Sequence, residues 1–164
     1  MGSRPSHREL YRLHFQDARR ERLFLASVSF FLTFFTVRAI TYGIRAGIGP
    51  FENLSVGGTH IHHLVWGILL LLAVGYLWLV QFGTGIGSSE RWASRLTALL
   101  YGGASALTLD EFALWLHLED VYWAREGRES IDAVILFAAL LSVSLCGGPF
   151  FHAVVREWTR LLRR

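Results

Sequence analysis

Residues 92–118 read WASRLTALLYGGASALTLDEFALWLHL, and this stretch decides the fold. It is long and apolar enough to cross a bilayer, which requires about 20 residues of helix. Gly102, Gly103 and Ala106 give it a face of small side chains, and such faces let helices approach closely in lipid. We therefore expect this helix to lie at the centre of a helical bundle, with the acids Asp110 and Glu111 near its end.

Three further apolar runs reach the same length, at residues 23–46, 62–82 and 132–155. Hydrophobic residues make up 52% of the 164-residue chain and charged residues only 18%, below the roughly 25% of a soluble domain. The sequence therefore predicts an all-α polytopic membrane protein, a bundle of four transmembrane helices over residues 23–155. Residues 1–22 and the basic tail 156–164 flank this domain.

The distribution of charge predicts the orientation of the chain. The N-terminal segment, the loop near Arg91 and the C-terminal tail together hold twelve arginines and five acids, whereas the opposite side holds four arginines and eight acids. An excess of arginine marks the cytoplasmic side, so both termini are expected there, in a multi-pass protein of the cell membrane. The capping-box pattern Ser6-His7-Arg8-Glu9 predicts a short N-terminal amphipathic helix on that surface.

Composition also excludes several kinds of chemistry. All sixteen basic residues are arginine, so no lysine-linked cofactor can form. Cys146 is the single cysteine, which excludes an intrachain disulfide and any zinc or iron–sulfur site built from cysteines. The arginines border apolar runs and do not form a surface stripe, so we expect no nucleic-acid partner.

Two charged residues are predicted deep in the outer part of the bilayer. Arg38 lies fifteen residues beyond the start of its run, and Asp110 lies fifteen residues beyond Arg95. At 1.5 Å per residue each sits roughly 22 Å from the inner boundary of a hydrocarbon core about 30 Å thick. Ionisable residues at such depth are costly and mark functional sites. We expect an ion pair between Arg38 and Asp110 or Glu111.

Further polar residues reach the same level and predict an outer-leaflet pocket. The first span adds Thr41, Tyr42 and Arg45 on the Arg38 face, three histidines open the second, His117 follows the acids by two turns on the Asp110 face, and Asp132 opens the fourth. The predicted catalytic residues are Asp110, Glu111, His63 and His117. The predicted substrate-binding residues are Arg38, Tyr42, Arg45 and Asp132. Histidine and carboxylate side chains also suit a divalent metal such as zinc, iron or manganese, with the candidate ligands His60, His62, His63, Asp110, Glu111 and His117.

This pattern leads to one hypothesis and three alternatives. The hypothesis is a membrane enzyme that hydrolyses a lipid or lipid-linked precursor, or transfers its head group, with an arginine gripping the phosphate. One alternative is a non-catalytic component that binds or transports a metal ion or protons, which would require a homo-oligomer. Another is an accessory membrane subunit. In the third, the charges form an ion-pair network that only fixes packing or assembly. Membrane lipids are the expected partners throughout.

Two strings also resemble those of an uncharacterised bacterial four-helix integral membrane protein family: GTHIHH at residues 58–63 and LDEFALWLHLEDVYW at residues 109–123. More distantly, the layout is similar to that of VanZ-like membrane proteins, with a histidine opening the second helix, an acid in the third and an aspartate opening the fourth. The corresponding positions are His62 or His63, Glu111 and Asp132. This resemblance implies a pocket that acts on lipid head groups or lipid-linked cell-envelope precursors.

Overall fold

The fold is helical apart from one short pair of strands. The computed structural model describes Ser6, Tyr11 and residues 13–50, 55–56, 59–84, 91–119 and 122–161, without the side chains of 55–56, 59–60, 147–158 and 160–161. The elements are α2 (Ala18–Ala46), β1 (Ser55–Val56), β2 (Thr59–His60), α3 (His63–Leu79), α4 (Arg91–Asp110), α5 (Phe112–His117), η2 (Arg125–Gly127) and α6 (Arg128–Leu161). The two strands pair antiparallel between α2 and α3.

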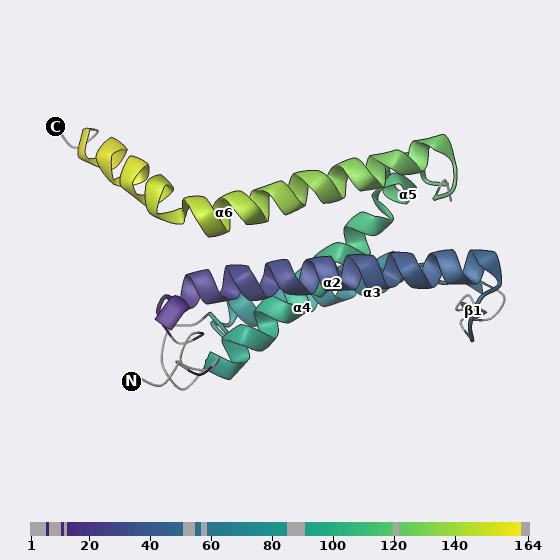
Figure 1. The fold of residues 1–164 in the computed structure, drawn as a ribbon, viewed down its shortest axis with the longest axis horizontal. Coiled ribbons are helices and arrows are strands. Elements are labelled where there is room, and N and C mark those ends of the chain that lie inside the picture. The colour runs from purple at the N-terminus through teal and green to yellow at the C-terminus, as the bar shows by residue number, and fades with distance from the viewer. Residues whose placement is uncertain are drawn as a thin grey trace.

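The long helices run between two ends of the molecule (Figure 1). The Glu21 end holds the start of α2, the end of α3 and the start of α4. The Asp110 end holds the two-stranded ladder, the break between α4 and α5, and the start of α6 (Figure 1). Helix α4 passes α2 obliquely and leads through α5 to α6, which runs back towards the Glu21 end (Figure 1).

Helix α4 is the interior helix, as its small side chains predict. A Cβ atom added at Gly102 would collide with the backbone carbonyl of Ala26 on α2. A Cβ atom at Gly67 of α3 would lie 2.8 Å from the backbone nitrogen of Thr108. Since both neighbours touch α4 at backbone distance, glycine is required at these crossings. The predicted close approach of helices on Gly102 is confirmed.

Helix α6 packs on α2 and α4 through a small apolar cluster. Phe30, Ala106, Val134 and Leu141 are buried together, and Phe137 of α6 meets Phe30 at a ring-centroid distance of 5.1 Å. These four residues come from α2, α4 and α6. The cluster holds α6 in place along its first half and so fixes the start of α6 at the Asp110 end.

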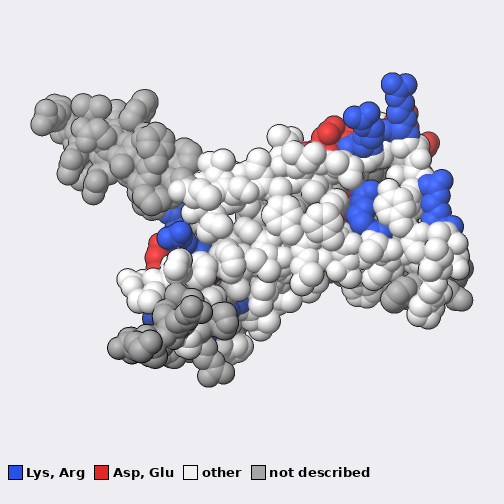
Figure 2. Space-filling view, in the orientation of Figure 1, with Lys and Arg blue, Asp and Glu red and all other residues white. Residues whose placement is uncertain are grey.

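Two helical segments among the described residues are long and apolar enough to cross a membrane, Ala18–Ala46 and Arg125–Cys146. Helix α3 is apolar but shorter, with 17 residues. Large apolar side chains point outwards from all three, among them Leu32 at 67% exposed, Leu72 at 65% and Leu136 at 73%. On the face shown in Figure 2, charged residues gather towards the two ends and leave an uncharged band between them.

The structure corrects two local predictions. The third apolar run is not one helix, because α4 ends at Asp110 and Glu111 takes φ −111° and ψ 28° before α5 begins. Asp110 and His117 therefore do not share a helix face. The three histidines do not all open the second helix either, since His60 belongs to β2 and α3 begins at His63. The predicted N-terminal amphipathic helix lies largely outside the described residues.

At the Glu21 end a buried acid forms an ion pair with an exposed arginine, a contact that the sequence did not reveal. Glu21 of α2 is 7% exposed and accepts hydrogen bonds from Arg95 of α4 and from the Tyr11 hydroxyl, at 2.8 and 2.7 Å. This contact attaches the chain before α2 to the α2–α4 crossing. Burial, followed by the hydrogen bond to Glu21, raises the pKa of Tyr11 to about 12.

We expect Tyr11 to make the protein sensitive to alkali. A phenol whose pKa is raised in the folded state contributes stability that is complete below pH ~10 and is lost as the pH rises through about 12. The stability difference between the wild type and Tyr11→Phe should therefore shrink over that range. Ultraviolet absorbance of tyrosinate, taken as a difference between the two proteins, should show one group titrating near pH 12. A difference titration near pH ~10 would contradict the assignment.

Candidate functional site

The centre of the candidate site is the fully buried carboxylate of Asp110, the last residue of α4. Its Oδ1 accepts a hydrogen bond from Nε of Arg38 on α2, which confirms the predicted pairing of these two residues. Its Oδ2 lies 3.1 Å from Nε2 of His63 and 3.0 Å from the Tyr122 hydroxyl. Three separate parts of the chain thus converge on one carboxylate. An unpaired charge buried at this point would be strongly destabilising.

The second acid, Glu111, occupies the break between α4 and α5 and caps a different helix. Its Oε2 accepts a hydrogen bond from the backbone nitrogen of Leu64 at 2.9 Å. That nitrogen is in the first turn of α3, where His62 at the N-cap makes no side-chain cap. A carboxylate at a helix N-terminus satisfies an orphan donor and is stabilised by the helix dipole. The break after Asp110 is what turns Glu111 towards α3.

Two adjacent histidines at the start of α3 face the two acids in different ways. His63 bridges them, with Nε2 3.1 Å from Asp110 and Nδ1 3.5 Å from Glu111. His62 contacts Glu111 through Nδ1, at 2.8 Å from Oε1. The imidazole of His63 thus lies between the two carboxylates. With Nδ1 of His62 donating to Glu111, its Nε2 carries the lone pair.

Tyr122 closes the site from the segment between α5 and α6. Its hydroxyl donates to Asp110, and its ring lies against the guanidinium of Arg38, with Cζ 4.6 Å from the ring centroid. Phe34 contacts the same guanidinium at 5.4 Å. Burial, together with the adjacent Asp110 charge, holds the pKa of Tyr122 well above its ordinary value. The phenol therefore remains a donor, and Arg38 is held between two rings.

Tyr42 and Arg45 lie further along α2, at the rim of the site. The guanidinium of Arg45 stacks over the indole of Trp123, with Cζ 4.1 Å from the ring centroid. The ring of Tyr42 meets the same indole at 5.0 Å. Both side chains are exposed. Because a stacked guanidinium uses its face, its N–H groups remain directed sideways, where a phosphate can be bound.

The structure leaves three of the predicted site residues apart from this cluster. His117 pairs with Glu129 at 2.8 Å and links the end of α5 to the start of α6. Asp132 is exposed on α6, and no described residue contacts its carboxylate. The side chain of His60 lies outside the described residues. The cluster therefore consists of Arg38, His62, His63, Asp110, Glu111 and Tyr122.

Among the described residues, no group of three His, Cys, Asp or Glu side chains is arranged so that it could hold a metal ion. The carboxylate oxygens of Asp110 and Glu111 accept hydrogen bonds from Arg38, Tyr122 and the Leu64 amide. The metal site therefore stays a prediction.

Comparison with known protein families, with curated proteins and with solved structures finds no match for this chain. The resemblance to the bacterial four-helix family and to VanZ-like proteins therefore stays a prediction.

Sequence reasoning did not place Tyr122 in the site, because a tyrosine near the membrane boundary is ordinarily an interfacial anchor. It also missed Ser130, whose hydroxyl accepts a hydrogen bond from the backbone nitrogen of Ala113 at 3.0 Å and so docks α5 on α6. A signal for Ser130 was its position at the polar start of the fourth helix. Tyr122 had no such signal, since its contact depends on how the α5–α6 connection folds.

Proposed function

We propose that the chain is a membrane enzyme that hydrolyses a lipid or lipid-linked precursor or transfers its head group. In this proposal α2, α3, α4 and α6 form four spans, both termini are cytoplasmic, and the Asp110 end lies in the outer leaflet. The outward-facing leucines of α2, α3 and α6 support the embedding, because apolar side chains that are two-thirds exposed are unfavourable in water and favourable in lipid.

The observation that carries the catalytic part is the pair formed by Glu111 and His62. A carboxylate on Nδ1 orients an imidazole and fixes the nitrogen that accepts a proton, which is the arrangement found in general bases of hydrolases. The side chain of His62 is 21% exposed, so a substrate at the rim can reach it. Asp110 does not suit this role, since its carboxylate is buried and three side chains occupy it.

The remaining residues of the cluster have supporting roles. Arg38 pairs with Asp110, and His63 lies between the two carboxylates, so both acids have partners at a depth where an uncompensated charge would be costly. Arg45, stacked on Trp123 two helical turns beyond Arg38, is placed to hold the phosphate of a head group. A water or alcohol molecule then gives its proton to His62 Nε2 as its oxygen attacks the phosphorus of the head group. The bond from phosphorus to the leaving oxygen breaks, and His62 returns the proton to that oxygen.

Purified protein tested with a panel of lipids examines this proposal. We expect release of the head group or phosphate from a phospholipid or a polyprenyl diphosphate, and a loss of about a hundredfold in Glu111→Gln. This variant retains an oxygen that can cap Leu64, so its unfolding temperature should stay near that of the wild type. His117→Gln is the matched control, since His117 contacts Glu129 and should keep its turnover. Equal turnover in Glu111→Gln and the wild type would disprove the proposed base pair.

A second candidate function follows from the bridging position of His63. One imidazole between two carboxylates can exchange a proton with either of them, as in a component that carries protons or a metal ion without catalysis. This function predicts a stable oligomer and no lipid turnover. Elemental analysis of protein purified without chelator then distinguishes a proton carrier from a metal carrier. In a metal carrier, a bound zinc, iron or manganese ion should disappear in Asp110→Asn.

A further inference from the structure

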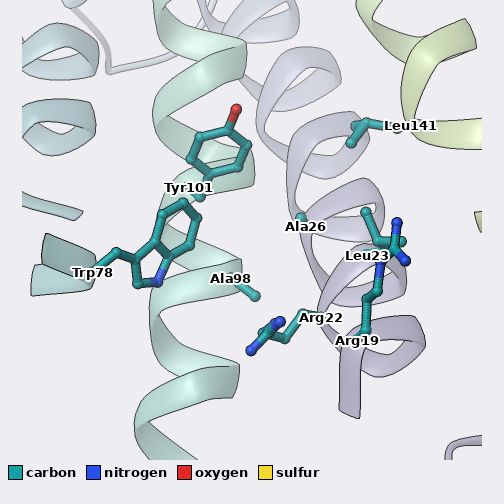
Figure 3. Close-up of a pocket in the computed structure, with 8 residues that line it drawn as sticks. All are labelled: Arg19, Arg22, Leu23, Ala26, Trp78, Ala98, Tyr101 and Leu141. Atoms are coloured by element: carbon teal, nitrogen blue, oxygen red, sulfur yellow. The ribbon is translucent and has the colours of Figure 1, made fainter. Parts of the chain in front are cut away.

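A second candidate site lies at the Glu21 end, away from the acids. It is a pocket of about 230 Å³ lined by all four long helices. Helix α2 supplies four of the lining residues, α4 two, and α3 and α6 one each. The lining residues are Arg19, Arg22, Leu23, Ala26, Trp78, Ala98, Tyr101 and Leu141 (Figure 3). None of them belongs to the Asp110 cluster.

The pocket is polar at one end and apolar at the other. Figure 3 shows the guanidinium of Arg22 directed towards α4 near Ala98, whereas the side chain of Arg19 extends on the other side of α2 beside Leu23. Tyr101 and Leu141 lie further along the helices (Figure 3). The rings of Trp78 and Tyr101 contact each other at a centroid distance of 5.3 Å and form one apolar wall. Arg22 thus lies where an amphiphile would place its charged group.

Charge complementarity identifies the sign of the ligand. Glu21, the acid nearest along α2, is already paired with Arg95. In the part of the chain that the structure describes, no carboxylate pairs with Arg22. A guanidinium binds phosphate through two parallel hydrogen bonds, so a phosphate at this opening can pair with Arg22.

The size and lining of the pocket identify the rest of the ligand. A volume of about 230 Å³ is below the ~300–1,000 Å³ of sites that enclose a whole small molecule. It suits part of one acyl chain, with the head group outside at Arg22. Aromatic and aliphatic walls favour a hydrocarbon chain over a soluble anion, since burying a polar molecule there would leave its hydrogen bonds unmade.

We infer that this pocket binds one anionic phospholipid, with its phosphate on Arg22 and an acyl chain against Trp78 and Tyr101. The inference depends on the membrane embedding proposed above and is independent of the chemistry at the Asp110 end. In the proposed orientation the arginines face the cytoplasmic leaflet, whose anionic lipids attract basic residues. The bound chain then fills the space between α2, α4 and α6.

Native mass spectrometry of the full chain in detergent tests this inference, with phosphatidylglycerol and phosphatidylcholine as the probes. We expect one retained phosphatidylglycerol per chain and weaker retention of phosphatidylcholine. Arg22→Gln should lower the affinity for phosphatidylglycerol about tenfold, because it removes a charge-assisted contact. The matched control is Arg20→Gln, which removes an equal charge from an exposed neighbour that does not line the pocket and should have no such effect.

Two further measurements separate this site from its alternatives. Glycerol phosphate, which has the charge without the chain, should bind far more weakly, and equal binding would show a simple anion site and overturn the inference. Equal loss in Arg22→Gln and Arg20→Gln, or equal retention of the two lipids, would also overturn it. Glu111→Gln should still bind phosphatidylglycerol, so failure of the proposed catalysis and failure of this site are distinguishable.

Discussion

Replacing Asp110 with alanine is expected to destabilise the protein by about 3–5 kcal/mol, the cost of breaking a buried ion pair from one side. The substitution removes the acceptor of Arg38, His63 and Tyr122 together. Arg38 would then keep its charge between Phe34 and Tyr122 without a carboxylate beside it. Reversible unfolding in detergent measures this loss directly.

A double variant separates the lost pair from the lost charge. Arg38→Met with Asp110→Leu replaces both partners by apolar side chains, which is close to neutral in buried ion pairs. We expect most of the stability to return. Asp132→Ala is the control, since that acid is exposed on α6 without a contact to its carboxylate among the described residues, and it should change stability by less than about 0.5 kcal/mol. Wild-type stability in Asp110→Ala would contradict the ion-pair account.

Replacing Gly102 with alanine should have a comparable effect, although it adds a single methyl group. The new Cβ would collide with the carbonyl oxygen, carbonyl carbon and Cα of Ala26, which are backbone atoms in the middle of α2. Because no side-chain rotation relieves this contact, α2 and α4 must move apart along their whole crossing. We expect a loss near 3 kcal/mol, at the upper end for overpacked sites.

Gly75 provides a control of the opposite sign. It lies in α3, and an added Cβ there meets nothing within 4 Å. Gly75→Ala should therefore stabilise the protein by about 0.5–1 kcal/mol, because alanine is the better helix former. Equal unfolding temperatures for the two alanine variants would show that the α2–α4 crossing is not as close as described.

The central elements of the fold followed from the sequence because they depend on composition over many residues. Residues 23–46 were predicted to form a helix, and α2 spans Ala18–Ala46. The small residues around Gly102 predicted the interior position of α4. Equal depth along two helices predicted the contact between Arg38 and Asp110, since a buried charge needs a partner at its own level.

Local features of the site could not be predicted in the same way. The apolar pattern around Glu111 is continuous and fits one helix, so it does not predict the break there. The break accompanies the tertiary contact of Glu111 with Leu64, which helix propensity does not reveal. The role of Tyr122 depends on the path of the α5–α6 connection. Glu21 looked like one acid in an arginine-rich segment, and its burial depends on Arg95, which is 74 residues away in the chain.

The four-span topology remains part of the proposal, because two helical segments in the described chain meet the length and composition of a span by themselves. Helix α4 falls short because its small and polar residues serve helix contacts: Thr97, Ser105 and Thr108 are buried. Such a helix is expected inside a bundle, where other helices shield it from lipid. The outward leucines of α3 and α6 are the surfaces that would contact lipid.

Chemical rescue of a His62 variant tests the central claim most directly. His62→Ala removes the proposed base and leaves the contacts among Arg38, His63, Asp110 and Glu111 intact. The proposal predicts wild-type stability, a loss of head-group release of about a hundredfold, and recovery of the rate as imidazole is added to the assay. Wild-type turnover by His62→Ala without imidazole would contradict the claim that this cluster carries acid–base catalysis through His62.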